Sequence, residues 1–259
     1  MQTIDLRNKF DLYRAKVALA GLFVLGVLVA NAQTYGNRTE NLINYDEEKI
    51  HYGFAFGGHA SKYIIKYNED FVSPSLDSLH SVVTRNLGGF KVGFIVNFHL
   101  YQYLDFRIQP TFGFYENELL YRFDDSSTRV LFKDATYFEL PLLLKYKSVR
   151  RKNTAMYIIG GINPSLEAAA SGDDVAEVET LETKNWNIAI DTGVGFDIYF
   201  PLFKFSPELR YSWGLRNMIR EEKNEFNAAL DKVIFHNLTF FITFEGGPSY
   251  LKKRNRRKG

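Results

Sequence analysis

The fold is decided by one stretch of eleven residues, Phe90-Lys91-Val92-Gly93-Phe94-Ile95-Val96-Asn97-Phe98-His99-Leu100. Every even position is apolar, whereas the odd positions are mostly small or polar. Side chains of a β-strand alternate between two faces, so this pattern predicts a strand with one apolar face. The period alone leaves the solvent open, because a soluble sandwich or a lipocalin alternates in the same way.

The same alternation recurs in seven further segments. They cover residues 50–57, 105–114, 138–145, 156–166, 186–198, 203–213 and 237–244. The pattern therefore predicts eight strands, each with one apolar face. The aromatic share of 16%, with 23 Phe and 16 Tyr, also favours β structure.

The connections favour a barrel in a membrane. Three are short (near 101–105, 147–153 and 200–203), and four are long and polar (near 60–87, 117–134, 168–184 and 214–231). Outer-membrane barrels alternate short periplasmic turns with long outer loops. Lipid forbids an open sheet edge, so the first strand should pair with the eighth. We predict an all-β fold, an eight-stranded antiparallel up-and-down transmembrane β-barrel of the OmpX/OmpA type, with both termini periplasmic.

The start of the chain predicts export. A positively charged region precedes an apolar run at 17–30, which is too short to span a bilayer comfortably. The run ends in Ala30-Asn31-Ala32 before Gln33, an A-x-A cleavage site. We therefore expect a signal peptide at 1–32, a periplasmic lead-in at 33–48, the outer-membrane β-barrel at 49–246 and a basic periplasmic tail at 247–259.

The charge balance excludes a nucleic-acid-binding face. The chain has 32 basic and 30 acidic residues, and without the leader 28 of each remain. Six of these basic residues form the tail: Lys252, Lys253, Arg254, Arg256, Arg257 and Lys258. The basicity is therefore that of a tail, which could touch anionic lipid or a periplasmic partner, or could simply be solvated. The absence of Cys excludes disulfides, thiolate metal sites and a lipoprotein anchor.

The polar face of the strands should point inward. An eight-stranded barrel is just wide enough for side chains, and buried charges must pair with one another. The candidate interior ion-pair residues are Arg107, Glu139, Asp191, Glu208 and Arg210. Arg107 should pair with a carboxylate such as Glu139 or Glu208. The barrel should then be filled by its own side chains, with Tyr101, Tyr103, Tyr146 and Tyr199 in an aromatic girdle near the short turns.

No catalytic, cofactor-binding or metal-binding residues are predicted. Asp191-Thr192-Gly193 matches the aspartic-protease triplet, but it lies inside a regular strand without a second carboxylate facing it. The five histidines could serve a lipid A-modifying barrel enzyme of the PagP/PagL type, yet a packed polar interior explains the inward ones. The acidic loop 168–184 could hold divalent cations, although it lacks the glycine spacing of a calcium loop.

Three segments resemble the PorT/SprT family, a branch of the outer membrane protein beta-barrel superfamily. They are Asn41-Leu-Ile-Asn-Tyr-Asp46 running into residues 50–54, the E-L-P-L-L-L-K-Y strand at 139–146, and the P-E-L-R-Y-S strand at 207–212. The last two are shared by the whole superfamily, and the first is the more specific. The resemblance spans residues 41 to 246.

The resemblance implies a role in type IX protein secretion and, through it, gliding motility or surface-protease export. It brings no catalytic residues, no cofactor, no nucleic acid and no small-molecule substrate. The partners expected are outer-membrane lipid and other type IX components. A filled barrel cannot conduct folded cargo, so we expect an accessory or assembly component. The alternatives are an OmpX-like structural or adhesive outer-membrane protein and, third, a lipid A-modifying barrel enzyme.

Overall fold

The computed structural model describes residues 40–43, 45–67, 79–85, 87–123, 128–170, 184–219 and 230–246. The expected cleavage site between Ala32 and Gln33, most of the acidic loop 168–184 and the basic tail lie outside these residues. The chain divides into two units, Met1–Glu40 and Asn41–Gly259, and the second contains every element below. Among the described residues no helix is long and apolar enough to cross a membrane.

Apart from one short 3-10 turn, η1 (Tyr45–Glu47), the described elements are strands. They are β1 (Ile50–Tyr67), β2 (Leu79–Arg85), β3 (Leu87–Tyr101), β4 (Leu104–Ile108), β5 (Thr111–Phe123), β6 (Thr128–Glu139), β7 (Leu142–Lys147), β8 (Thr154–Ala170), β9 (Trp186–Tyr199), β10 (Lys204–Gly214) and β11 (Leu230–Gly246).

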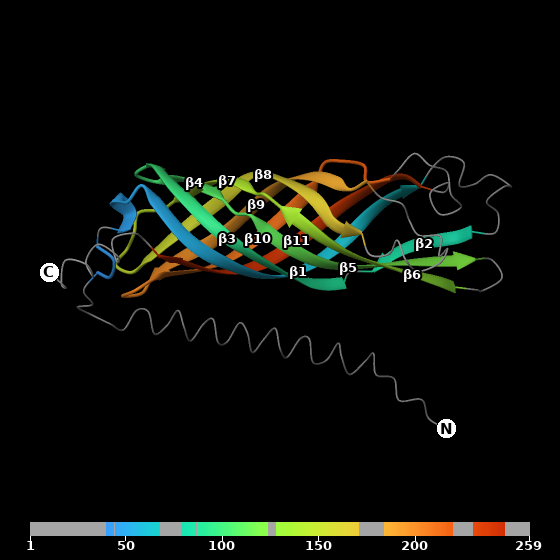
Figure 1. Ribbon diagram of the computed structural model, residues 1–259, viewed down its shortest axis with the longest axis horizontal. Coiled ribbons are helices and arrows are strands. Elements are labelled where there is room, and N and C mark those ends of the chain that lie inside the picture. The colour runs from blue at the N-terminus through green and yellow to red at the C-terminus, as the bar shows by residue number, and fades with distance from the viewer. Residues whose placement is uncertain are drawn as a thin grey trace, which may run out of the picture. The chain divides into compact units, whose positions relative to one another are not determined.

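These segments form a closed ring of eight antiparallel strands (Figure 1). Around the ring the order is β1, β2/β3, β4/β5, β6/β7, β8, β9, β10 and β11, where a slash joins two pieces of one interrupted strand. The seam closes where β11 pairs with β1, from Tyr52↔Gly246 to Tyr67↔Leu230. The predicted fold class, an eight-stranded all-β barrel, is confirmed.

Two of the interruptions lie at prolines. Pro110 separates β4 from β5, and Pro141 separates β6 from β7. Proline has no N–H to donate to a neighbouring strand, so the regular ladder breaks at these positions. The residues beside them keep the wall joined, because the Gln109 N–H donates to the Pro141 carbonyl (3.1 Å) and the Leu140 N–H donates to the Pro164 carbonyl (2.9 Å).

The two faces of the wall differ as the alternation predicts. Phe94 points outward with 59% of its surface exposed, whereas its neighbour Ile95 points inward with 1% exposed. The apolar rows on the other strands are also outward, so the face assignment is confirmed. The girdle assignment of Tyr199 is wrong, because this side chain is buried in the lumen with 2% exposed. Tyr199 has the same odd parity as Asp191 and Asp197 on β9, and parity, not closeness to a turn, decides its direction.

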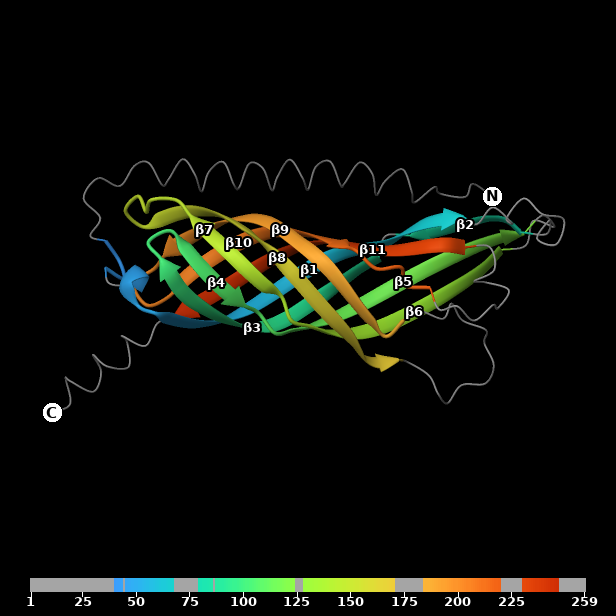
Figure 2. The same cartoon turned by 90° about the horizontal axis from the view of Figure 1, so that it is seen from above.

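The expected long loops at 60–87 and 117–134 are also wrong in their bounds. Pairing of β1 with β11 continues to Lys66↔Lys232, and pairing of β5 with β6 continues to Arg122↔Thr128. Backbone hydrogen bonds do not require apolar side chains, so the strands run on after the apolar rows end. Figure 2 shows β2, β5 and β6 reaching past the other strands at one end of the barrel.

Closure predicts resistance to SDS at room temperature. A ring without an edge has its strand hydrogen bonds satisfied by neighbours, so unboiled protein should keep the barrel and migrate differently from boiled protein. The measurement is gel mobility of refolded protein before and after boiling, with Thr243→Pro as the matched variant. Thr243 lies within the β11 ladders to Ala55 and Ser206. Identical mobility of boiled and unboiled wild-type protein would contradict a closed ring.

Candidate functional site

The lumen holds a charge-balanced set of ionisable side chains. Among the described residues, six cations and six anions are buried on the inner face. They are Lys91, Arg107, Lys145, Lys147, Lys204 and Arg210 with Asp105, Glu139, Asp191, Asp197, Glu208 and Glu245. A buried charge without a partner costs on the order of several kcal/mol. A sealed lumen therefore favours equal numbers of cations and anions.

Arg107 is the centre of this set. Its guanidinium donates to Glu208 at 3.1 Å and to Glu245 at 2.7 Å, and no part of its side chain is exposed. Glu208 also accepts hydrogen bonds from Arg210 and from the Tyr157 hydroxyl (2.8 Å). One guanidinium thereby joins β4 to β10 and β11 across the lumen.

A second group lies toward the end with the three short turns (102–103, 148–153 and 200–203), which we name the turn end. The Lys145 ammonium donates to both oxygens of Asp197 (2.8 Å each). Lys204 lies 3.0 Å from Glu245 and 3.9 Å from Asp197, which links this group to Arg107. Lys147 pairs with Asp105 at 2.9 Å.

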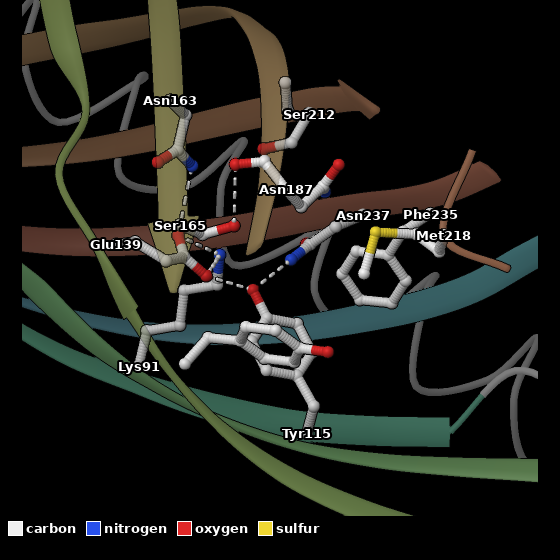
Figure 3. Close-up of a pocket in the computed structure, with 12 residues that line it drawn as sticks. Lys91, Tyr115, Glu139, Asn163, Ser165, Asn187, Ser212, Met218, Phe235 and Asn237 are labelled. Carbon is white, nitrogen blue, oxygen red and sulfur yellow. Dashed lines mark hydrogen bonds and ion pairs between the residues drawn. The ribbon is translucent and has the colours of Figure 1, made fainter. Parts of the chain in front are cut away.

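A third group lies toward the opposite end, beside a small cavity (Figure 3). The Lys91 ammonium donates to both Glu139 oxygens at 2.9 Å, and Asn163 and Tyr115 donate to the same carboxylate. The cavity has a volume of about 20 Å³, which is room for roughly one water molecule. Met218 covers one side of it, as the figure shows. The lumen is therefore nearly filled at this level.

The five predicted ion-pair residues are all buried, but they are not all paired with one another. Arg107, Glu208 and Arg210 are in direct contact, and Asp191 lies 3.8 Å from Arg210. Glu139 is paired with Lys91 and not with Arg107. Asp191 sits inside β9 with an arginine as its partner, which is a structural role for the D-T-G triplet. A side chain at Gly195 would overlap the ring of Tyr157, so this glycine relieves crowding in the lumen.

Two members of the lumen set were missed by sequence reasoning. The sequence pattern places Lys147 in a turn, and Glu245 lies one residue past the end of the last predicted strand, although both belong to strands in the structure. Both have the inward parity of their strands, since Lys147 follows Lys145 by two residues and Glu245 follows Thr243 by two. Continuing the alternation by one step would have found them.

The segment before β1 is not a free lead-in. Residues 41–43 and 45–48, which we name the strap, lie against the turn end. The backbone N–H of Asn41 donates to the Asn153 side chain (2.8 Å), and the side-chain amide of Asn41 donates to the Tyr199 carbonyl (3.0 Å). Arg150 donates to the Leu42 carbonyl (3.2 Å) and to that of Asn41. The part of the predicted lead-in that the structure describes next to β1 is therefore bound to the barrel.

A closed antiparallel ring with an apolar outer surface and a paired, polar lumen defines an integral membrane β-barrel. The chain belongs to the outer membrane protein beta-barrel domain family, whose model matches residues 31–220. It is therefore an outer-membrane β-barrel protein.

Solved barrels with similar folds were also found. Neisserial surface protein A is 12% identical over 77% of this chain and 99% of its own, with a TM-score of 0.43. OprG from Pseudomonas aeruginosa is 12% identical over 77% and 96%, with a TM-score of 0.48. Ail from Yersinia pestis, solved in complex with the heparin analogue sucrose octasulfate, is 10% identical over 76% and 99%, with a TM-score of 0.35. At such identities the likeness concerns the fold alone. No curated protein sequence matches this chain significantly.

Proposed function

We propose that this protein is a non-conducting accessory or assembly component of type IX protein secretion. The observation that carries the proposal is the resemblance of the strap and the start of β1 to the PorT/SprT family. Two side chains of this segment contact the barrel: the Asn41 side-chain amide donates to the Tyr199 carbonyl, and the Tyr45 ring stacks on His51.

The filled, ion-paired lumen supports a role in which this barrel lies beside the translocation channel and does not itself conduct the cargo. Arg107 and Lys145 have no exposed surface on their side chains, and the ion pairs of Arg107 link strands on different sides of the ring. A folded cargo could pass only if these buried pairs were broken. Breaking each pair would cost on the order of several kcal/mol. A component that helps another channel to assemble needs no such opening.

The test is a deletion of the gene with a comparison of the secreted proteins. Cargo that carries the type IX C-terminal signal should be trapped in the periplasm, while other outer-membrane proteins assemble normally. Restoring the intact gene should restore export. Normal export in the deletion strain would discard the secretion role and favour the OmpX-like structural or adhesive function. An altered lipid A mass spectrum in the same strain would instead favour an enzyme.

The basic tail is a second element of the proposal, as a docking element on the periplasmic side. A chain that ends at residue 251 lacks Lys252, Lys253, Arg254, Arg256, Arg257 and Lys258. If the tail docks onto a component of the machine, this truncation should reduce export as the full deletion does. Normal export by the truncated chain would discard the tail and leave the barrel's role in place.

A further inference from the structure

The strap crosses the mouth of the barrel at the turn end. It enters β1 at Ile50, yet Asn41 is bound to Asn153 and Tyr199, at the start of β8 and the end of β9. In the ring of eight strands, β8 and β9 lie across the lumen from β1. The blue η1 turn of the strap is seen at this end in Figures 1 and 2. The strap therefore spans the opening instead of running along its rim.

The centre of the strap inserts an aromatic ring into the lumen. Tyr45 is 2% exposed and stacks on His51 with ring centroids 4.0 Å apart. The edge of Tyr199 meets it at 5.9 Å, and the Lys204 ammonium lies 4.8 Å from its ring centroid. An ammonium under an aromatic face is an attractive contact that strengthens when water is excluded. The mouth thus provides a slot for one aromatic side chain, with a cation beneath it.

The next residue places a carboxylate between two cations. Asp46 lies 3.3 Å from Lys147 and 3.6 Å from Arg150, and it accepts a hydrogen bond from the Tyr199 hydroxyl at 3.0 Å. Burial raises the pKa of the Asp46 carboxyl, but Lys147, Lys204 and the Tyr199 hydroxyl outweigh burial and hold this pKa below its usual value. Asp46 is therefore ionised at neutral pH and is held by two cations, Lys147 and Arg150, which we name the clamp.

A slot for an aromatic ring beside a clamp for a carboxylate, with hydrogen bonds to the backbone of the same segment, is the chemistry of a peptide-binding site. We propose that the turn-end mouth binds a short peptide with an aromatic residue followed by a carboxylate, and that the strap is its ligand within the chain. The same site accepts an equivalent segment from another polypeptide when the strap leaves it. This holds whether or not the barrel serves type IX secretion.

The strap has the advantage of being tethered. A ligand joined to its site by a short linker acts at an effective concentration of about millimolar, so a free peptide competes poorly with an intact strap. Weakening the strap's own contacts removes this barrier while leaving the receptor residues of the barrel unchanged. Tyr45→Ala with Asp46→Ala does so in the full chain, because neither residue belongs to the slot or to the clamp.

Binding is measured by fluorescence anisotropy with a labelled peptide of the sequence Asn-Leu-Ile-Asn-Tyr-Asp-Glu-Glu, residues 41–48. The full-length double variant in detergent micelles should bind it saturably, and wild-type protein should bind at least about tenfold more weakly. Peptides with Tyr→Ala or Asp→Asn should also lose about tenfold or more, which corresponds to about 1.4 kcal/mol for each contact. Absence of binding to a folded double variant, or equal binding of all three peptides, overturns the proposal.

A second measurement tests the proposal even if the double variant does not fold. The chain has no Cys, so a nitroxide can be placed at Ile43→Cys, which is 72% exposed on the strap. In protein that carries only Asp46→Asn besides the label, excess wild-type peptide should displace the strap and increase the mobility of the label. The peptide with Tyr→Ala should not. An unchanged spectrum with the wild-type peptide, or the same change with both peptides, contradicts an exchangeable peptide site.

Discussion

Replacing Arg107 with methionine should destabilise the barrel by about 3–5 kcal/mol, the usual cost of removing one partner from a buried ion pair. The substitution leaves five buried cations against six anions among the described lumen residues, with Glu208 and Glu245 each losing a donor. Urea unfolding in lipid vesicles measures the change. Trp186 and Trp213 both face outward and report loss of the barrel through their fluorescence.

Two variants separate charge from packing in this experiment. Arg107→Met combined with Glu245→Gln restores the balance of charges, so it should be more stable than Arg107→Met alone. Arg151→Met removes a cation from an exposed position in the β7–β8 turn and should change stability by no more than about 0.5 kcal/mol. If Arg107→Met costs no more than Arg151→Met, or if the second substitution brings no recovery, the lumen is not held by paired charges.

The alternation of side chains was sufficient to predict the ring of strands and the direction of each face. A period of two fixes which residues share a face, so Phe94 outside and Arg107 inside follow from parity alone. Parity would also have placed Tyr199 and Glu245 correctly, had it been applied to the ends of strands. At the end of a strand, parity and not closeness to a turn decides the direction of a side chain, as Tyr199 shows.

The choice of ion-pair partners could not be read from the sequence. Arg107 shares the inward face with several carboxylates, and its partners on β10 and β11 are more than 100 residues away along the chain. Which carboxylate it meets depends on the stagger between strands that are not neighbours in the ring. That quantity appears only when the ring is closed, because it sums the register of every intervening pair.

The strap was missed for a different reason. Residues 41–48 have neither the alternation of a strand nor the length of a helix, and a short polar segment before a strand ordinarily predicts a loop. Its position depends on tertiary contacts, such as the stacking of Tyr45 on His51 and the hydrogen bonds of Asn41. The only signal in the sequence was the resemblance of this segment to one family, which marked the segment as unusual without giving its place.

Phe94→Arg should cost roughly 2–4 kcal/mol, the range for a cation on the lipid face near the middle of a bilayer. Phe94 pairs with Phe54 across β1 and β3, with ring centroids 5.3 Å apart, so the substitution also removes an aromatic contact. The matched change is Leu202→Arg in the short turn between β9 and β10, which should cost about 0–1 kcal/mol because a turn lies close to water. Urea unfolding in vesicles compares both with the wild-type protein.

The depth of Phe94 can be measured independently of stability. Cysteines at positions 92, 94 and 96, each carrying a fluorophore, should be quenched by probes attached to lipid chains. A cysteine in place of Ile95, which is 1% exposed and points into the lumen, should not be quenched. Because positions 94 and 95 are adjacent, the two sites differ by only about 3 Å along the strand and face opposite sides of the wall. Quenching at 95 and not at 94 would invert the assignment of inside and outside, and then Phe94→Arg should be tolerated while Ile95→Arg is not.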